Sequence, residues 1–344
     1  MIKTIGVLTG GGDSPAINAA IRAIFIKANK YGYKVIGIRN GWEGLVKGNA
    51  SELQMSDVAN ILSTGGTMIG TSRTNPFNIE NGVNMVLENI KKFKLDAIIT
   101  IGGDDTNGVM YKLYTQHGFK GVGIPQTIDN DIAYSDFSIG FESSLEIVTE
   151  AIDKLRTTAC SHNRVMIVEI MGRDAGWLTL YGGIAGGADI ILIPEVNFKF
   201  DEIVMILKER KNRGANYSII AVAEGAKPEE LDKQIVSKGT VDSFGHVQLG
   251  GISKIIADEL EKRTGFECRT MVLGHLQRGG TPTAFDRLIG TRLGAYAVDL
   301  IHEGKFGNLA TMYKGEITAV PVTQALTETK PMDMDLYELT KLFY

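Results

Sequence analysis

Residues 5–30, IGVLTGGGDSPAINAAIRAIFIKANK, decide the fold class. The apolar run Ile5–Leu8 ends in a glycine turn, and a helical pattern follows over Pro15–Lys30. Pro15 suits the first turn of a helix, because proline lacks the N–H that a helix start leaves unbonded. A strand, a glycine turn and a helix in this order predict the start of a parallel β-α-β unit.

The same alternation recurs along the chain. Most expected strands are apolar and β-branched on both faces, which is typical of strands covered on both sides. The expected strands are Ile5–Leu8, Lys34–Ile38, Ala97–Ile101, Gly121–Ile124, Val165–Ile170, Ile190–Ile193, Ser218–Ala223 and Arg269–Leu273. The expected helices are Pro15–Lys30, Val83–Lys92, Asp105–His117, Ser143–Thr157, Asp201–Arg210, Gly250–Arg263 and Ala284–His302. This order predicts an α/β protein with two doubly wound, three-layer domains and largely parallel sheets.

Length and composition bound the function. A chain of 344 residues exceeds a typical single domain, and we expect a boundary near residue 139. Residues 1–138 with part of the C-terminal region would form one domain and 139–305 the other, the chain crossing back near 305–344. A net charge of −4 without a basic block argues against nucleic-acid binding, and no apolar run is long enough for a membrane span. Two cysteines without metal-like spacing indicate a reducing, cytoplasmic compartment.

Glycines gather directly after the expected strands. The clusters are Gly10–Gly12, Gly102–Gly103, Gly172, Gly225 and Gly274. One such cluster needs no more explanation than a turn with positive φ. In open parallel sheets, ligands bind beyond the carboxyl ends of the strands, so clusters at five strand ends indicate a site there.

Two of these turns carry groups that suit phosphate. TGGGD at 9–13 and IGGDDTNG at 101–108 each join a strand to a helix, and N–H groups exposed by glycines at a helix start can cradle a phosphate. Neither has the spacing of a P-loop or of the dinucleotide fingerprint. Asp104 or Asp105 can cap the helix, or can hold Mg²⁺ together with phosphate oxygens.

A third turn, PQTIDND at 125–131, places two aspartates after a strand. Such residues form ordinary turns. One of them can also act as the general base on a sugar hydroxyl, with Thr127 binding the substrate, because phosphoryl transfer depends on positioning and charge neutralisation.

Several arginines near the ends of expected strands, together with Arg73 after the glycine-rich segment GGTMIGTSR, suit an anionic ligand. A single arginine forms a surface salt bridge more often than a ligand site. Several together suit a clamp, because the guanidinium group binds phosphate through two parallel hydrogen bonds. They are Arg73, Arg164, Arg173, Arg269 and Arg278, and His275 lies close to the last of them.

Together these segments resemble the phosphofructokinase family. They are TGGGDSPAINAAIR, GGTMIGTSR, IGGDDT, TIDND, SHNRVMIVEIMGR, AEGA and VLGHLQRGGTP, in the order of the family and over nearly the whole chain. The resemblance implies a phosphofructokinase-like fold and Mg²⁺-dependent transfer of a phosphoryl group to the 1-hydroxyl of fructose 6-phosphate, a step of glycolysis. It also implies a homodimer or homotetramer whose subunits share active sites.

By this resemblance the site residues divide by ligand. Those at the phosphoryl donor are Gly12, Arg73, Asp105 and Gln126, with Asp104 as the Mg²⁺ ligand. Asp129 would be the base, and Arg173 would touch the transferring phosphate. Those at the sugar phosphate are Thr127, Asp131, Arg164, Met171, Gly172, Glu224, Arg269, His275 and Arg278. In the family, the residues that match Arg164 and Arg269 come from the neighbouring subunit.

The resemblance leaves pyrophosphate and ATP open as donors. ATP-using members usually have glycine where this chain has Asp105, whose carboxylate would crowd the α-phosphate of a nucleotide. Pyrophosphate users usually carry lysine where this chain has Gln126. We favour pyrophosphate, which would make the reaction reversible.

Two other functions compete with this interpretation. An NAD kinase-type enzyme would explain the GGD turn and leave TIDND, MGR and GHLQRGG unexplained. A non-catalytic sugar-phosphate sensor should lack the catalytic base, yet Asp129 and Arg173 are both present. A wider range of sugars, such as sedoheptulose 7-phosphate, is compatible with the sequence.

Overall fold

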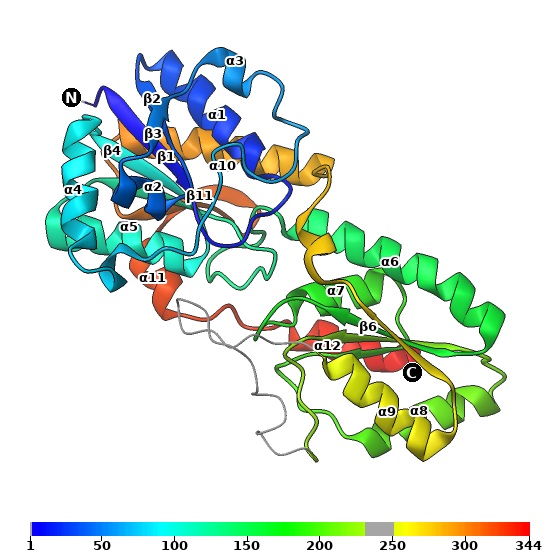
Figure 1. Ribbon diagram of the computed structural model, residues 1–344. Helices are drawn as coiled ribbons and strands as arrows, with labels where there is room; N and C mark the ends of the chain where they lie inside the picture. Colours follow the sequence, from blue (N-terminus) through cyan, green and yellow to red (C-terminus); the bar gives the residue numbers. More distant parts are fainter. Residues whose placement is uncertain (1, 231–250) are drawn as a thin grey trace. The chain divides into compact units, whose positions relative to one another are not determined.

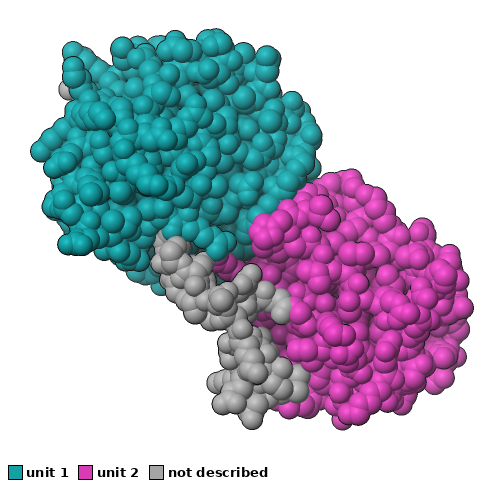
Figure 2. Space-filling view, viewed as in Figure 1, with its two compact units in different colours: residues 1–143, 278–330 teal, residues 144–277, 331–344 magenta. Residues whose placement is uncertain are grey.

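The computed structural model describes residues 2–230 and 251–344, and the chain divides into two compact units (Figure 2). Unit 1 contains Met1–Ser143 and Arg278–Lys330, and unit 2 contains Ser144–Gln277 and Pro331–Tyr344. The chain therefore passes between the units three times. The assignment of the donor to one part of the chain and of the sugar phosphate to the other stays a prediction.

Unit 1 is built on a sheet whose described strands have the order β11-β10-β5-β4-β1-β2-β3. They are β1 (Thr4–Thr9), β2 (Lys34–Ile38), β3 (Ala50–Glu52), β4 (Ala97–Gly102), β5 (Gly121–Pro125), β10 (Asn308–Tyr313) and β11 (Glu316–Pro321). The central strands run parallel, and the edge strands β3 and β11 are antiparallel to their neighbours. From β1 the chain proceeds to β2 on one side and β4 on the other, so the switch point of the sheet lies between β1 and β4.

Helices cover both faces of this sheet (Figure 1). α1 (Ile17–Lys30) and α10 (Ala284–His302) pack against each other over one face, where Ile24 and Leu293 are fully buried. The other face is covered by α2 (Trp42–Lys47), α4 (Gly82–Lys92), α5 (Asp104–His117) and α11 (Val322–Thr327). A Cβ at Gly294 would lie 2.5 Å from the carbonyl oxygen of Ala20, so the glycine lets α1 and α10 approach closely.

Unit 2 is built on a parallel sheet whose described strands have the order β7-β8-β6-β9. They are β6 (Val165–Ile170), β7 (Ile190–Leu192), β8 (Ser218–Ala223) and β9 (Cys268–Val272). The helices are α6 (Phe141–His162), α7 (Trp177–Ala185), α8 (Phe200–Asn212), α9 (Ile252–Thr264) and α12 (Met334–Thr340). α8 and α9 bury Leu207 and Ile256 against one face, while α6 and α7 lie on the opposite face (Figure 1).

The predicted α/β class with mainly parallel sheets is confirmed. Each expected strand and helix is present: β2, β6, β8 and α10 have the predicted bounds, and the others differ at one or both ends. Gly250, the expected start of one helix, lies outside the described residues. The structure adds elements that the sequence did not indicate, among them β3, α7, β10, β11 and α12. Within the described residues, none of the helices has the length and apolar character needed to span a membrane.

Candidate active site

The three polar turns predicted from the sequence lie side by side in unit 1. Thr9, at the end of β1, is in register with Ile101 of β4, and Gly102 is in register with Pro125 of β5. The N–H of Gln126 donates to the carbonyl oxygen of Gly102 at 3.0 Å. TGGGD, GGDD and QTID therefore share the carboxyl edge of the sheet at its switch point, where ligands bind in such folds.

Close packing explains several glycines of these turns. A Cβ at Gly10 would lie 2.5 Å from Oγ1 of Thr106, and one at Gly102 would lie 2.7 Å from Cβ of the same threonine. Of Gly10, Gly11 and Gly102, Gly11 alone has a positive φ, 84°. The first two turns are thus packed together around Thr106, and their backbone positions are fixed.

The segment before Arg73 is bonded to the first turn. Oγ1 of Thr71 donates to the carbonyl oxygen of Gly11 at 2.8 Å, and the N–H of Gly11 donates to the carbonyl oxygen of Ser72 at 3.1 Å. Arg73 follows directly and is exposed. These bonds place Arg73 near the TGGGD turn. Its contact with the donor stays a prediction.

Arg278 and Gln126 also lie against the TGGGD turn. A Cβ at Gly12 would lie 2.2 Å from Nη1 of Arg278, and this guanidinium group donates to the carbonyl oxygen of Asp13 at 3.2 Å. Nε2 of Gln126 donates to the carbonyl oxygen of Gly12 at 3.0 Å and to Oγ of Ser14 at 3.1 Å. The amide hydrogens of Gln126 are therefore used within the turn, and Gln126 acts here as a brace between β5 and the turn.

The predicted base, Asp129, lies on the loop between β5 and α6. Its side chain is 7% exposed, and its N–H donates to Oγ1 of Thr127 at 3.1 Å. Asn130 has a φ of 53°, and its amide bonds both the carbonyl oxygen of Asp136 at 3.1 Å and the N–H of Ser138 at 2.9 Å. These bonds fold the loop back on itself and bury the aspartate.

Further carboxylates stand on the same turns. Asp104 and Asp105 begin α5, and Oδ1 of Asp104 accepts the N–H of Asp105 at 2.8 Å. Asp104 and Asp131 are exposed, and Asp105 is half-buried. Within residues 2–230 and 251–344, no three His, Cys, Asp or Glu side chains group as metal ligands. Mg²⁺ usually takes one or two carboxylates plus substrate phosphates, so the hard oxygens of Asp104 and Asp105 fit it.

In unit 2, four predicted residues meet at the carboxyl ends of β6 and β8. Oε1 of Glu224 accepts the N–H of Gly172 at 3.3 Å and the N–H of Arg173 at 3.1 Å. Gly172 and Arg173 have positive φ values of 148° and 51°, so the chain turns sharply as it leaves β6. The N–H of Met171 donates to Oε1 of Gln277 at 3.3 Å. We refer to Met171–Arg173, with Glu224 and Gln277, as the MGR turn.

His275 is exposed in the 3₁₀ helix Gly274–Arg278, which follows the carboxyl end of β9. Because β9 runs parallel to β6, His275 and the MGR turn belong to the same edge of the sheet. Its contact with the 6-phosphate stays a prediction.

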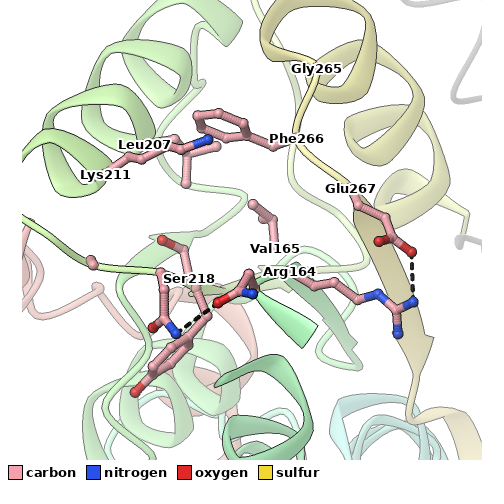
Figure 3. Close-up of a pocket in the computed structure, with 12 residues that line it drawn as sticks. Arg164, Val165, Leu207, Lys211, Ser218, Gly265, Phe266 and Glu267 are labelled. Atoms are coloured by element: carbon pink, nitrogen blue, oxygen red, sulfur yellow. Dashed lines mark hydrogen bonds and ion pairs between the residues drawn. The ribbon is translucent and has the colours of Figure 1, made fainter. Parts of the chain in front are cut away.

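Arg164 and Arg269 lie toward the opposite, amino end of that sheet. Nη2 of Arg164 is 2.7 Å from Oε1 of Glu267 (Figure 3). Nη2 of Arg269 donates to the same oxygen. The hydrogen bond from Arg164 is the main cause that lowers the pKa of Glu267. A strand rises about 3.3 Å per residue, so the length of β6 separates Arg164 from Met171 by more than the reach of a side chain.

A cavity of about 320 Å³ opens beside this ion pair (Figure 3). Val165, Leu207 and Phe266 give it apolar walls, and Nζ of Lys211 lies 4.2 Å from the centre of the Phe266 ring. Arg164 is the one predicted site residue that lines it. The cavity belongs to the amino edge of the sheet, away from the MGR turn.

Sequence reasoning missed four polar residues that support these turns. Asn130 and Gln277 lie inside motifs that were recognised, and their burial, 2% and 0% exposed, is what the sequence did not reveal. Glu267 carried no signal beyond its charge. Asp286, 1% exposed, accepts the N–H of Gly140 at 3.0 Å and that of Ser143 at 2.8 Å, and burial raises its pKa. In sequence it looks like an ordinary residue of a first helical turn.

Doubly wound parallel sheets, glycine turns at a switch point and carboxylates beside them define an α/β protein of the phosphotransferase class. The sequence profile of the family described as Phosphofructokinase matches residues 4–301. The chain belongs to the phosphofructokinase family, and the predicted resemblance is confirmed.

Relatives of both donor types match the full chain. It is 47% identical to the "Pyrophosphate--fructose 6-phosphate 1-phosphotransferase" of Dictyoglomus thermophilum, over 99% of this chain and 98% of that protein. It is 45% identical to the "ATP-dependent 6-phosphofructokinase" of Corynebacterium efficiens, over 96% of each. The solved phosphofructokinase of Pichia pastoris in the T-state superposes with a TM-score of 0.83 at 32% identity, and this chain spans about a third of it, 36%, while being covered completely.

Proposed function

We propose that this protein is a pyrophosphate-dependent 6-phosphofructokinase that converts fructose 6-phosphate and pyrophosphate into fructose 1,6-bisphosphate and phosphate. The observation that carries the proposal is the buried Asp129 on a turn that adjoins two packed glycine turns. Relatives named for this reaction, at 46–47% identity over 99% of the chain, support it.

The geometry suggests how the chain's own residues act. The carboxylate of Asp129 takes the proton from the 1-hydroxyl of the sugar, whose oxygen then bonds to one phosphorus of pyrophosphate. The bond from that phosphorus to the bridging oxygen breaks, and phosphate leaves. Burial raises the strength of the electrostatic interactions that orient such a base. Backbone N–H groups of the TGGGD turn, with Arg73, bind the donor, and the guanidinium group of Arg173 binds the transferring phosphate.

We propose Mg²⁺ as the metal and Asp104 as its protein ligand, with Asp105 beside it. When bound, Mg²⁺ neutralises the charge of the phosphate oxygens. The N-terminal position of both carboxylates on α5 keeps them at the edge where GGDD and TGGGD meet.

Asp105 is the residue that we propose to decide the donor. It is half-buried at the start of α5, where a negative charge is favoured by the helix dipole but repels the additional phosphate of a nucleotide. Gln126, the residue that argued against pyrophosphate, braces the TGGGD turn through Gly12 and Ser14. Gln126 thus has a structural role that does not depend on which donor binds.

We also propose that active sites are shared between copies of the chain. Arg164 directly precedes β6 and Arg269 is in register with Met166, so both lie several residues along the strands from the MGR turn, which supports separate sources for these groups at one sugar phosphate. A neighbouring copy supplies the missing guanidinium groups in this proposal. The test mixes Asp129→Ser with Arg164→Ala, each of which we expect to be inactive alone, after mild dissociation and reassociation. Recovered activity supports shared sites, because one site of each hybrid is intact, and no recovery contradicts them.

The first test of function is formation of fructose 1,6-bisphosphate from fructose 6-phosphate and Mg²⁺, with pyrophosphate and ATP offered separately. Product with pyrophosphate alone is the expected result. Product with ATP alone would contradict pyrophosphate as the donor, while the phosphorylation of fructose 6-phosphate would still be supported. Binding of sugar phosphate without turnover would favour a sensor, and phosphorylation of NAD would favour an NAD kinase-type enzyme. Sedoheptulose 7-phosphate, offered in parallel, measures the range of sugars.

A further inference from the structure

The loop that carries Asp129 is held from outside by a segment close to the end of unit 1. This segment, residues 328–330, follows α11 and ends where the chain leaves unit 1. Thr329 forms an isolated antiparallel bridge with Ile132. The hydroxyl of Tyr134 donates to Oε2 of Glu328 at 2.7 Å. We call residues 328–330 the strap.

Lys330 completes the strap. Its Nζ donates to the carbonyl oxygen of Asp136 at 2.9 Å, the same oxygen that accepts from the amide of Asn130 at 3.1 Å. Asn130 directly follows Asp129, so one carbonyl oxygen links the lysine to the neighbour of the proposed base. A displacement of Asp136 is therefore passed through a single side chain to the residue beside Asp129.

The β10–β11 hairpin holds the loop from another side. The N–H of Asp136 donates to the carbonyl oxygen of Met312 at 2.8 Å, and the N–H of Gly315 donates to Oδ2 of Asp136 at 2.8 Å. Hairpin and strap both fix Asp136, but only the strap brings a positive charge to it among the contacts described for this loop.

Charge gives the lysine a second effect. The loop contains Asp129, Asp131 and Asp136, and under the proposed function it must receive an anionic sugar phosphate and an anionic donor. Asp136 and Asp131 both act electrostatically on Lys330, which therefore lies among these carboxylates. An ammonium group there reduces the repulsion between the loop and its substrates.

We infer that Lys330 is a positioning residue of the active site, which holds the Asp129 loop in place through the carbonyl oxygen of Asp136 and offsets the charge of the loop. No motif quoted from the sequence contains this residue, and no role was predicted for it. The inference rests on the proposed function for its kinetic effect, and its structural part stands independently.

The protonation state of Lys330 should make kcat depend on pH, which a residue that acts through packing alone would not do. Burial lowers the pKa of Lys330 to about 8, against the opposing effect of Asp136 and Asp131. The other titratable groups at the strap are Glu328 and Tyr134. The hydrogen bond to Glu328 raises the pKa of Tyr134, and the ring of Tyr313 from the hairpin packs on the ring of Tyr134. The positive charge is present below this pKa and lost above it, so kcat should fall as pH rises through about 8.

The test compares Lys330→Met, which keeps an unbranched chain without charge, with Lys330→Arg, which keeps the charge at all accessible pH values. The control is Lys91→Met, at an exposed lysine in the last turn of α4. We expect Lys330→Met to lower kcat by roughly 10- to 100-fold at pH 7, because a small misplacement of a base is costly. KM for the anionic substrates should rise by a smaller factor, because the loop loses a positive charge. The alkaline limb of the pH profile, which is the fall of kcat near pH 8, should be absent in Lys330→Met. Lys330→Arg should keep much of the wild-type kcat and show no fall of kcat near pH 8, because its charge does not titrate in this range.

Hydrogen exchange of residues 127–138 separates the two possible failures. If the wild-type protein forms no fructose 1,6-bisphosphate, the proposed function fails, yet faster exchange of this loop in Lys330→Met than in Lys91→Met would still support the strap. A Lys330→Met protein with wild-type kcat, alkaline limb and exchange would overturn the inference. Equal loss of kcat in Lys330→Met and Lys330→Arg, with unchanged exchange, would overturn it as well.

Discussion

Replacement of Gly172 by alanine tests whether the MGR turn positions Arg173. Gly172 has a φ of 148°, and a Cβ placed on it would lie 2.4 Å from the carbonyl oxygen of Ala175. The oxygen belongs to the backbone, so the turn itself must shift to admit the methyl group. A side chain in such a conformation costs about 1–3 kcal/mol, which corresponds to a decrease in Tm of roughly 2–12 °C for a unit of this size.

The shift of the turn should displace Arg173, because Gly172 and Arg173 are hydrogen-bonded to the same acceptor. The N–H groups of Gly172 and Arg173 both donate to Oε1 of Glu224, so moving one displaces the other. We expect kcat for fructose 1,6-bisphosphate formation to fall by about 10- to 100-fold, since a misplacement of about 1 Å can reduce the rate 100-fold.

Gly214→Ala is the matched control in the same unit. Gly214 has a φ of 94°, and no heavy atom lies within 4 Å of the position of its Cβ. Alanine there should incur the conformational strain without the collision, and so lower Tm while kcat is kept. If Gly172→Ala turned over within twofold of Gly214→Ala, the MGR turn would not position a catalytic group, and the reasoning from Glu224 would be refuted.

Three further substitutions test the remaining roles. Asp129→Ser should lower kcat by several orders of magnitude while binding of fructose 6-phosphate, measured by calorimetry, survives; persistent activity would show that another group is the base. Asp105→Gly should raise kcat/KM for ATP relative to pyrophosphate, and an unchanged ratio would mean that this carboxylate does not select the donor. Glu267→Gln should lower KM for fructose 6-phosphate by about two- to fivefold, because the carboxylate competes with phosphate for two partly exposed guanidinium groups. A higher KM would show instead that Glu267 holds the arginines in place.

The central strands could be predicted from the sequence because parallel strands that are covered on both faces consist of continuous runs of apolar residues. It did not predict β10 and β11, although Lys314 and Gly315, with φ values of 53° and 80°, form the two-residue turn typical of a hairpin. α7 was not predicted, and it contains Gly182 and Gly183, a residue type that is unfavourable in a helix interior. In the structure a Cβ at Gly182 would lie 2.5 Å from Val148, so these glycines serve helix packing.

The site shows the same division between local and distant information. The three turns of unit 1 could be predicted to converge, since each follows a parallel strand and such ends meet at one edge. What supports the turns could not be predicted. Gln277 contacts Met171, and Lys330 contacts Asp136, across separations that no periodicity or spacing connects. Burial of these polar groups arises only when the chain has folded.

The packing of the glycine turns bears on the proposed choice of donor. Gly10 and Gly102 are glycines because Thr106 fills the space of their side chains, whereas the atoms nearest to a Cβ at Gly12 belong to the flexible end of Arg278, which can shift. The sequence alone does not separate this cause from a positive φ, since both require the same residue. A turn fixed by such contacts has one shape, whichever donor it meets. We propose that discrimination between pyrophosphate and ATP comes from side chains that border the turn, and that Asp105, half-buried at the start of α5, is one of the charged groups that a nucleotide would have to pass.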